Sequence, residues 1–358
     1  GDSMAKIVIK VGSNLLVKTS GDINKSYIIE LSRTIAGLKK NGNSCILITS
    51  GARAAGYGKA QKANGEEELY IKQALCAIGQ VQLMKLYELA FDMYDEKVAQ
   101  ILINRDDFGH RQRFLNLRNT LIGLNEMGFI PIANENDTVA TSEITFGDND
   151  ILAAMTAIGW KSDYLVLLSS VDGLMDDQDR LIKLFTKDTV LKKMEKTRWG
   201  SGGIETKIRA ARAASAAGVR SCICNGRDLS TIERFLTGEN PGTGFEPSKK
   251  PASKKAWIGF LSRTKGEIII NHGAKKALMM KKSLLPVGIV DVKGSFETGD
   301  VIDVKTVDGE QIGRGIANFS SSQTKKIMGC QSSQLTQQLN SSGSTCIVHV
   351  DNFWLVPE

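Results

Sequence analysis

The chain has 358 residues, of which 42% are hydrophobic and 24% are charged, and its formal net charge is +7. This composition excludes a largely disordered chain, and no apolar run approaches the roughly 20 residues that a membrane-spanning helix needs. The N-terminal residues lack the basic-then-apolar pattern of a secretory signal, so we expect a cytoplasmic location and no membrane contact.

Short apolar runs alternate with helical patterns over the first 225 residues. Because several of these runs are continuously apolar, they predict a mostly parallel sheet covered by helices on both faces, a three-layer αβα fold. Ligands of such sheets bind at the carboxyl ends of the strands. Strands are expected at 5–11, 44–49, 98–103, 129–133, 164–168 and 219–224, with helices at 26–40, 67–94, 111–127 and 206–217.

The character of the chain changes near Gly238, where a segment rich in Gly, Pro and Lys begins. Such a composition is typical of a linker. The segments beyond it are short and separated by turns, which predicts a small β-rich second domain with strands at 266–271, 288–292, 300–306 and 346–350. We expect a first domain over 4–240, a linker over 241–255 and the second domain over 256–352.

The positive charge is concentrated in the C-terminal third. Residues 248–358 hold 15 Lys and Arg against 9 Asp and Glu, whereas the first 247 residues hold 31 against 30. This asymmetry indicates either a polyanion partner, such as RNA, or a solvated lysine-rich face.

Six cysteines are scattered through mostly apolar runs, with no CxxC pair and only three histidines in the chain. This pattern favours buried thiols over a zinc or redox site. The cysteines are Cys45, Cys76, Cys222, Cys224, Cys330 and Cys346.

Three glycine-containing loops adjoin the predicted strands and helices of the first domain. They are Lys10-Val-Gly-Ser-Asn14, Ser50-Gly-Ala-Arg-Ala-Ala-Gly56 and Gly200-Ser-Gly-Gly-Ile-Glu-Thr-Lys207. Glycines let backbone N–H groups approach phosphate oxygens, so the three loops together predict a nucleotide phosphate site. The Walker A sequence is absent, because Gly58-Lys59 is followed by alanine. Considered singly, Lys10 could instead be an exposed lysine at a strand end, and Lys207 an exposed lysine on a helix surface, with no role in phosphate binding.

Residues 134–150 contain five carboxylates and three asparagines, with no histidine or cysteine. Such oxygen-bearing side chains suit magnesium, calcium or the ammonium group of a substrate, although a solvated acidic loop has the same composition. Asn134 and Asp137 follow a strand, and 148–150 begin the next helix. They could hold an amino acid whose carboxylate accepts a phosphoryl group, a reaction that needs no catalytic base.

The order of these motifs resembles that of the glutamate 5-kinases in the amino acid kinase family, over nearly the whole chain. The resemblance implies phosphoryl transfer from MgATP to the γ-carboxylate of L-glutamate, the first step of proline biosynthesis. It also implies feedback inhibition by proline and a homo-oligomer, either dimer or tetramer. The matching motifs are Lys10-Val-Gly-Ser13, Thr49-Ser-Gly-Ala52, Asn134-Glu-Asn-Asp137, Gly147-Asp-Asn-Asp150 and Gly202-Gly-Ile-Glu-Thr-Lys207.

The same resemblance implies a role for individual residues. Lys10 and Lys207 would be catalytic, and the metal would be held mainly by ATP rather than by direct protein ligands. Glutamate would contact Ser50, Gly51, Asn134, Asp137, Asn149 and Asp150. The nucleotide would contact Lys10, Gly12, Ser169, Ser170, Ser201, Gly202, Gly203, Ile204, Glu205, Thr206 and Lys207.

The C-terminal segment 256–351 resembles a PUA domain, a module best known from RNA-modifying enzymes. The resemblance and the basic surplus together make RNA contact one expectation for this domain. Two alternatives stay open from the sequence: another carboxylate or carbamate kinase of the same family, or a chiefly RNA-binding protein.

Overall fold

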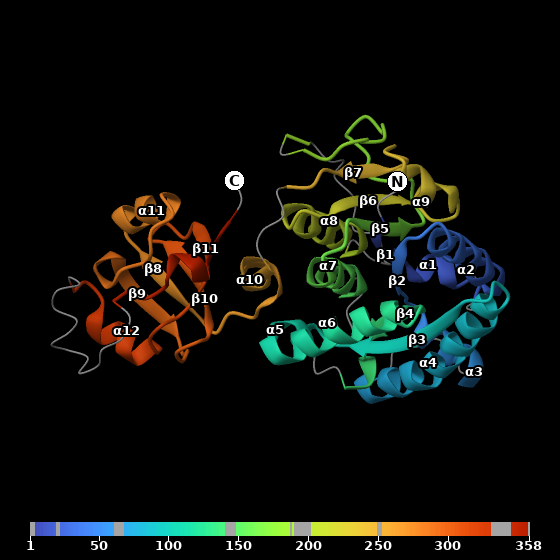
Figure 1. Cartoon of the computed structure of the whole chain (residues 1–358), viewed down its shortest axis with the longest axis horizontal. Coiled ribbons are helices and arrows are strands. Elements are labelled where there is room, and N and C mark those ends of the chain that lie inside the picture. Colours follow the sequence, from blue (N-terminus) through green and yellow to red (C-terminus); the bar gives the residue numbers. More distant parts are fainter. Residues whose placement is uncertain are drawn as a thin grey trace. The chain divides into compact units, whose positions relative to one another are not determined.

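The computed structural model describes residues 4–18, 22–60, 68–139, 148–186, 188–189, 202–248, 253–330 and 345–356. The chain divides into two compact units (Figure 1), here called unit 1 (Gly1–Asp107 and Gln112–Lys250) and unit 2 (Phe108–Arg111 and Pro251–Glu358). Within the described ranges, every helix is too short or too polar to cross a membrane.

Unit 1 is built on a seven-stranded sheet with the strand order β3-β4-β2-β1-β5-β6-β7. All neighbouring strands pair in parallel except β7, which runs antiparallel to β6. The predicted mostly parallel sheet is therefore confirmed, although β7 was not predicted. The strands are β1 Lys6–Val11, β2 Ser44–Ile48, β3 Lys97–Ile103, β4 Phe129–Glu135, β5 Tyr164–Ser169, β6 Arg220–Asn225 and β7 Thr243–Phe245.

Helices cover both faces of this sheet (Figure 1). Apolar side chains of α2 (Lys25–Lys40), α4 (Leu69–Asp92) and α9 (Ser230–Leu236) form one buried cluster with one face of the central strands. Helices α7 (Asp148–Trp160) and α8 (Gly202–Ala216) pack against each other and against β1, β5 and β6. The remaining helical elements are α1 Ser13–Leu16, α3 Ala52–Ala60, α5 Arg105–Gly109, α6 Arg111–Glu126 and the 3₁₀ turn η1 Asp137–Val139.

The alternation of side chains along β1 decides which residues reach which helices. Ile7, Ile9 and Val11 belong to the apolar cluster with α2, α4 and α9. Because successive side chains of a strand point to opposite faces, Val8 and Lys10 lie on the other face, where α7 contacts β1. The position of Lys10 in the strand therefore directs its ammonium group toward α7 and α8.

Helices α3 and α4 are in main-chain contact at two glycines. A Cβ at Gly79 would lie 1.7 Å from the carbonyl oxygen of Ala52, and a Cβ at Gly56 would lie 2.0 Å from that of Leu75. Only glycine permits so close an approach. The sequence interpretation of 50–56 as an open loop is wrong in part, because α3 already begins at Ala52.

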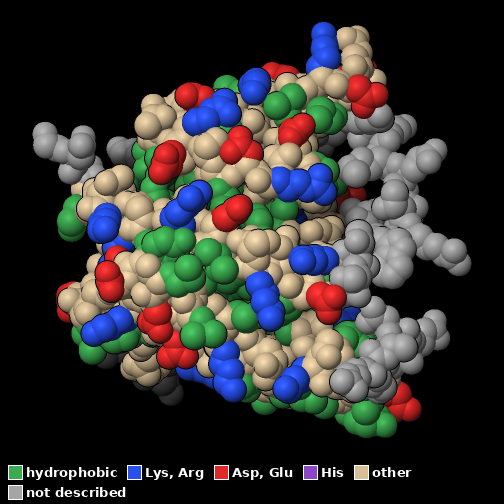
Figure 2. All heavy atoms as spheres, turned by 90° about the vertical axis from the view of Figure 1, so that its right-hand side faces the viewer, with side chains coloured by type: hydrophobic (Ala, Val, Ile, Leu, Met, Phe, Trp, Pro, Cys, Tyr) green, Lys and Arg blue, Asp and Glu red, His purple; other side chains and the backbone are tan. Residues whose placement is uncertain are grey.

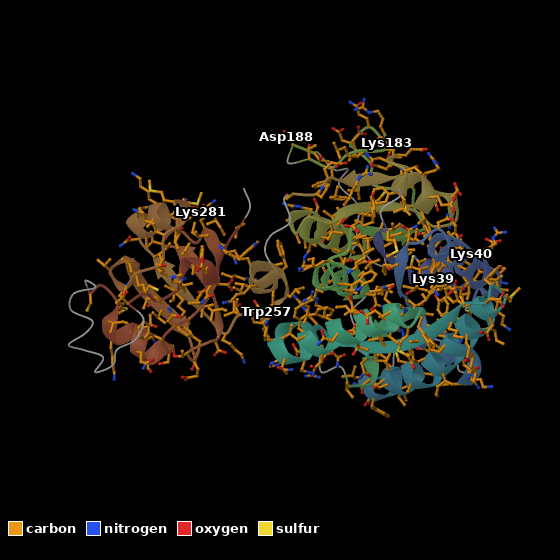
Figure 3. All side chains as sticks on the ribbon, in the orientation of Figure 1. Lys39, Lys40, Lys183, Asp188, Trp257 and Lys281 are labelled. Atoms are coloured by element: carbon orange, nitrogen blue, oxygen red, sulfur yellow. The ribbon has the colours of Figure 1, made fainter. Side chains whose placement is uncertain are left out.

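Unit 2 contains a five-stranded sheet with the order β12-β11-β10-β8-β9, which confirms the predicted β-rich second domain. Strand β8 pairs in parallel with β10, and the other pairs are antiparallel. The strands are β8 Gly266–Ile270, β9 Ile289–Gly294, β10 Val301–Thr306, β11 Gln311–Ile316 and β12 Phe353–Leu355. The helices are α10 Ser253–Ala256, α11 His272–Met279 and α12 Ser321–Ile327, with a π-helical segment at Trp257–Leu261 and 3₁₀ turns at Pro286–Gly288 and Val350–Asn352. Figure 3 marks Trp257 and, after α11, Lys281.

The strand predicted at 346–350 is wrong. Cys346, Ile347 and Val348 are buried, but only Val348 forms a strand-type bridge, with Leu284. Their apolar character reflects a loop packed into the unit 2 core, and the strand in this region is β12.

The surface of unit 1 carries charges of both signs. In the face drawn in Figure 2, Lys and Arg side chains are interspersed with Asp and Glu. This mixture agrees with the near-balance of 31 basic and 30 acidic residues in the first 247 positions. Interspersed charges of both signs are typical of a solvated surface.

Candidate active site

Polar side chains gather where the central strands of unit 1 end. Lys10 is the penultimate residue of β1, Ser50 follows β2, and Asn134 lies near the end of β4. The first turn of α7 carries Asn149 and Asp150. Since the carboxyl ends of parallel strands meet at one edge of a sheet, the fold brings these predicted residues together.

Two lysines share one buried carboxylate at this edge. The Nζ of Lys10 lies 2.6 Å from Oδ1 of Asp150, and the Nζ of Lys207 on α8 lies 3.0 Å from its Oδ2. The hydroxyl of Thr206 donates to the same Oδ2 at 3.1 Å. Asp150 is fully buried and Lys10 nearly so, while the Lys207 side chain is 11% exposed. With all three ionised, the cluster has a net charge of +1, which favours an anion beside it.

Burial and mutual attraction shift the ionisation of this cluster. Burial lowers the pKa of Lys10 from 10.5 to about 8, opposed by the attraction of Asp150 and reinforced by the repulsion of Lys207. Burial alone would raise the pKa of Asp150, but the two ammonium groups offset this effect and hold the pKa below its ordinary value. Asp150 is therefore ionised at neutral pH, and Lys10 loses its charge at a lower pH than an exposed lysine.

Asn149 lies beside this cluster and has a fixed amide orientation. Its Nδ2 donates to the carbonyl oxygen of Thr49 at 2.9 Å and to Oδ1 of Asn134 at 3.0 Å, with the Ser50 hydroxyl at 3.4 Å. A main-chain carbonyl can only accept, so the nitrogen must face Thr49. The Asn149 Oδ1 is buried and has no hydrogen-bond donor among the described residues.

Asn134 extends the same chain of amides to helix α4. Its Oδ1 accepts from the backbone N–H of Glu135 at 2.9 Å, and its Nδ2 donates to Oε1 of Gln80 at 2.8 Å. Gln80 was not predicted as a site residue, because one glutamine in a helical pattern carries no signal of its own.

The turn after β2 positions Ser50 at the start of α3. Gly51 has φ +91°, a conformation that favours glycine, and its carbonyl accepts from the N–H of Ala55 at 3.0 Å. The Ser50 hydroxyl donates to the carbonyl of Val11 at 2.9 Å. The neighbouring Thr49 hydroxyl is 2.8 Å from that of Tyr87 on α4, so the turn is tied both to β1 and to α4.

Asp137 lies on η1 and lines a cavity of about 280 Å³. Gln80 and Cys76 of α4 line the same cavity, and Val81 and Leu102 add apolar side chains. Burial, followed by the nearby Asp137 carboxylate, raises the pKa of Cys76 to about 12. The thiol therefore stays protonated at neutral pH, as predicted for a buried cysteine.

The predicted nucleotide-binding residues near β5 are held by main-chain hydrogen bonds. The N–H of Gly12 donates to the carbonyl of Leu168 at 3.3 Å, so this donor is already used within the sheet. Ser169 ends β5 and accepts from the N–H of Gly226 at 2.8 Å. Ser170 follows it and is half-buried. None of these contacts involves the lysine cluster, so the structure leaves their predicted role open.

Helix α8 carries the other predicted nucleotide-binding residues. It begins at Gly202, with Gly203, Ile204, Glu205 and Thr206 in its first turns. Thr206 and Lys207 contact Asp150, whereas Glu205 is exposed. Ser201 lies outside the described residues. The helix thus presents its N-terminal end close to the lysine cluster, an arrangement that favours anions.

Comparisons with known proteins agree with this geometry. Residues 5–225 match the model of the amino acid kinase family, and residues 266–339 match that of the PUA domain. A glutamate 5-kinase of Kosmotoga olearia is 56% identical over 355 residues, covering 98% of this chain and 99% of that protein. A glutamate 5-kinase of Thermotoga maritima is 54% identical over 350 residues, with the same coverage of each chain.

A solved structure of a Giardia carbamate kinase has a similar fold. It superposes with a TM-score of 0.52 at 18% identity, covering 69% of this chain and 100% of that chain. At this level of identity the likeness concerns the fold and not the substrate.

Proposed function

The chain belongs to the amino acid kinase family, among the glutamate 5-kinases, and from this we propose that it transfers the γ-phosphoryl group of ATP to the γ-carboxylate of L-glutamate. The observation that supports the proposal most directly is the buried cluster in which Lys10 and Lys207 share Asp150. A single carboxylate cannot neutralise two ammonium groups, so positive charge is available to a transferring phosphoryl group.

In the proposed reaction, the protein must position two anions, ATP and the glutamate γ-carboxylate, and neutralise the negative charge of the transferred phosphoryl group. The glutamate γ-carboxylate is ionised near pH 7, so no residue has to remove a proton from it. Lys10 and Lys207 stabilise the negative charge on the equatorial oxygens of the transferred group. Asp150 holds the two ammonium groups in place, so little reorganisation is needed during transfer.

The amide groups at the strand ends fit the amino acid substrate. The buried Oδ1 of Asn149 accepts no hydrogen bond from the described residues, so it is available as an acceptor for a ligand ammonium. We assign Ser50, Gly51 and Asn134 to the same substrate site, because they surround Asn149 or adjoin its contacts. Asp137 is assigned to the cavity beside it.

The residues around the lysine cluster fit an ATP phosphate chain. Lys10, Lys207 and the N-terminal turn of α8 supply cationic and N–H donors, and the predicted residues of β5 and α8 are assigned to the nucleotide. Magnesium bound to the phosphates would neutralise part of their charge. We propose that ATP carries the metal, as the resemblance to the glutamate 5-kinases implies.

The activity should decrease in alkaline solution. A lysine is cationic below its pKa, and the pKa of Lys10 is lowered to about 8. We expect kcat/KM for ATP to be constant below this value and to fall by about tenfold per pH unit above it, because the deprotonated amine no longer neutralises phosphate. A pH profile of kcat/KM tests this, and an unchanged value up to pH 10 would contradict it.

Formation of γ-glutamyl hydroxamate from L-glutamate, MgATP and hydroxylamine tests the function itself. Aspartate, N-acetylglutamate and carbamate serve as parallel acceptors. Turnover that strongly favours glutamate supports the proposal. A preference for another acceptor would favour a different carboxylate or carbamate kinase of the same family, and no turnover with any acceptor would refute the kinase assignment.

Several expectations from the sequence stay predictions: inhibition by proline, assembly into a homo-oligomer, a cytoplasmic location and RNA contact. The basic C-terminal third is the observation that favours RNA contact by unit 2. An electrophoretic shift at moderate salt, compared with a heparin competitor, tests it. RNA that does not bind under these conditions would remove the RNA-binding alternative.

A further inference from the structure

Gln80 presents a hydrogen-bond donor that has no acceptor in the described part of the chain. The backbone N–H of Glu135 must face an oxygen, which fixes Oδ1 of Asn134 toward it and directs the Asn134 Nδ2 to Gln80. Gln80 therefore accepts through Oε1, and its Nε2 points away from this bond. That nitrogen is buried and unpartnered among the described residues.

A buried N–H group without an acceptor is costly, and native proteins rarely retain one without a reason. Gln80 lines the cavity that also contains Asp137 and Glu135. The cavity thus combines the Gln80 donor, unpartnered among the described residues, with two carboxylates and with apolar side chains, Val81 and Leu102. The polar side chains of Gln100, Asn136 and Thr138 also line it. Its volume of about 280 Å³ lies near the lower end of small-molecule sites, as expected for a ligand the size of an amino acid.

We propose that Gln80 is a specificity-determining residue for the acceptor: its Nε2–H donates to the α-carboxylate of glutamate, while Asp137 faces the α-ammonium group. This inference rests on the proposed function and adds a residue to its substrate site. The two cavity carboxylates repel an acceptor that lacks the ammonium group, and the Gln80 amide favours one that has the α-carboxylate. The residues that bind the α-carboxylate and α-ammonium groups of the substrate are thereby distinct from Lys10 and Lys207, which act on the transferred phosphoryl group.

Two substitutions separate this donor from the structural role of Gln80. Gln80→Met keeps the length of the side chain and removes both polar groups. Gln80→Glu keeps an oxygen that accepts from Asn134 but replaces the donor by a negative charge. We expect KM for glutamate to rise by about 10- to 100-fold in Gln80→Met and further in Gln80→Glu, with KM for ATP changed less than about twofold.

L-Isoglutamine, in which the α-carboxylate is a carboxamide, provides the decisive comparison. A carboxylate at position 80 accepts from the carboxamide N–H, so Gln80→Glu should shift the ratio of kcat/KM values from glutamate toward isoglutamine by about tenfold or more. A purely structural role predicts the opposite order, with Gln80→Glu near the wild type because its bond to Asn134 persists.

The outcomes distinguish this inference from the function on which it rests. Thermal unfolding of each variant first establishes that it is folded. If the wild type phosphorylates glutamate but both variants retain its KM, or if Gln80→Glu shows no shift toward isoglutamine, the role of Gln80 is refuted and the kinase assignment stands. If the wild type phosphorylates no acceptor, the kinase assignment itself fails.

Discussion

Lys207→Ala is expected to lower kcat by about 100- to 1,000-fold, the usual effect of removing one group that stabilises transition-state charge. With Lys207 present, the cluster of two lysines and Asp150 has a net positive charge; without it, Lys10 and Asp150 neutralise each other. The stability of the fold should change little, because the remaining buried charges are still paired. Steady-state kinetics and urea unfolding measure the two effects separately.

Arg209→Ala is the matched control for this experiment. Arg209 is an exposed cation on the same helix, two residues from Lys207, so its removal changes the net charge of the protein equally without touching the cluster. It should retain kcat within about twofold, as surface substitutions usually do.

Lys207→Ala has a second readout, the pKa of Lys10, which should rise when the repulsion by Lys207 is removed. Near-wild-type turnover of Lys207→Ala would refute its catalytic role.

Gly79→Ala is expected to destabilise unit 1 by about 3 kcal/mol, at the upper end of overpacking effects. The new Cβ would lie 1.7 Å from the carbonyl oxygen of Ala52, so the main chains of α3 and α4 must separate. Since α3 follows Ser50 and α4 carries Gln80, the separation should also raise KM for glutamate. Urea unfolding and initial-rate kinetics provide the two measurements.

Gly123→Ala is the control for that substitution. Gly123 also lies within a helix, α6, but apart from the adjoining backbone of its own helix a Cβ there would have no neighbour within 4 Å. Alanine should therefore stabilise the helix, by about 0.5 to 1 kcal/mol. If Gly79→Ala were as stable as Gly123→Ala, the close contact of α3 and α4 would not exist in solution.

The sequence predicts the sheet and much of the site because the strands are continuously apolar and several site residues directly follow them. Continuously apolar strands predicted the parallel sheet, and residues at the strand ends predicted the site, since a parallel sheet places those ends at one edge. The resemblance to the glutamate 5-kinases adds Lys207 and Asp150 to Lys10, and the structure brings the three together. Their assigned roles remain predictions, because proximity does not establish function.

The features that the sequence did not reveal depend on contacts between distant residues. Strand β7 has three residues and exists through its pairing with β6. Helix α3 contains two glycines, which locally favour a loop, but Gly56 allows the close packing on α4 that stabilises the helix. The importance of Gln80 likewise depends on Asn134, more than fifty residues away in the chain.

The position of Lys10 within β1 also affects how the protein folds. A shift of β1 by one residue in its pairing with β2 or β5 would turn Lys10 into the apolar cluster that now contains Ile9 and Val11. An ammonium group would then be buried without a counterion, and Asp150 would lose one of its partners. The lysine assigned to phosphoryl transfer therefore also disfavours the shifted register of β1, and its replacement by an apolar residue would remove that penalty as well as a charge.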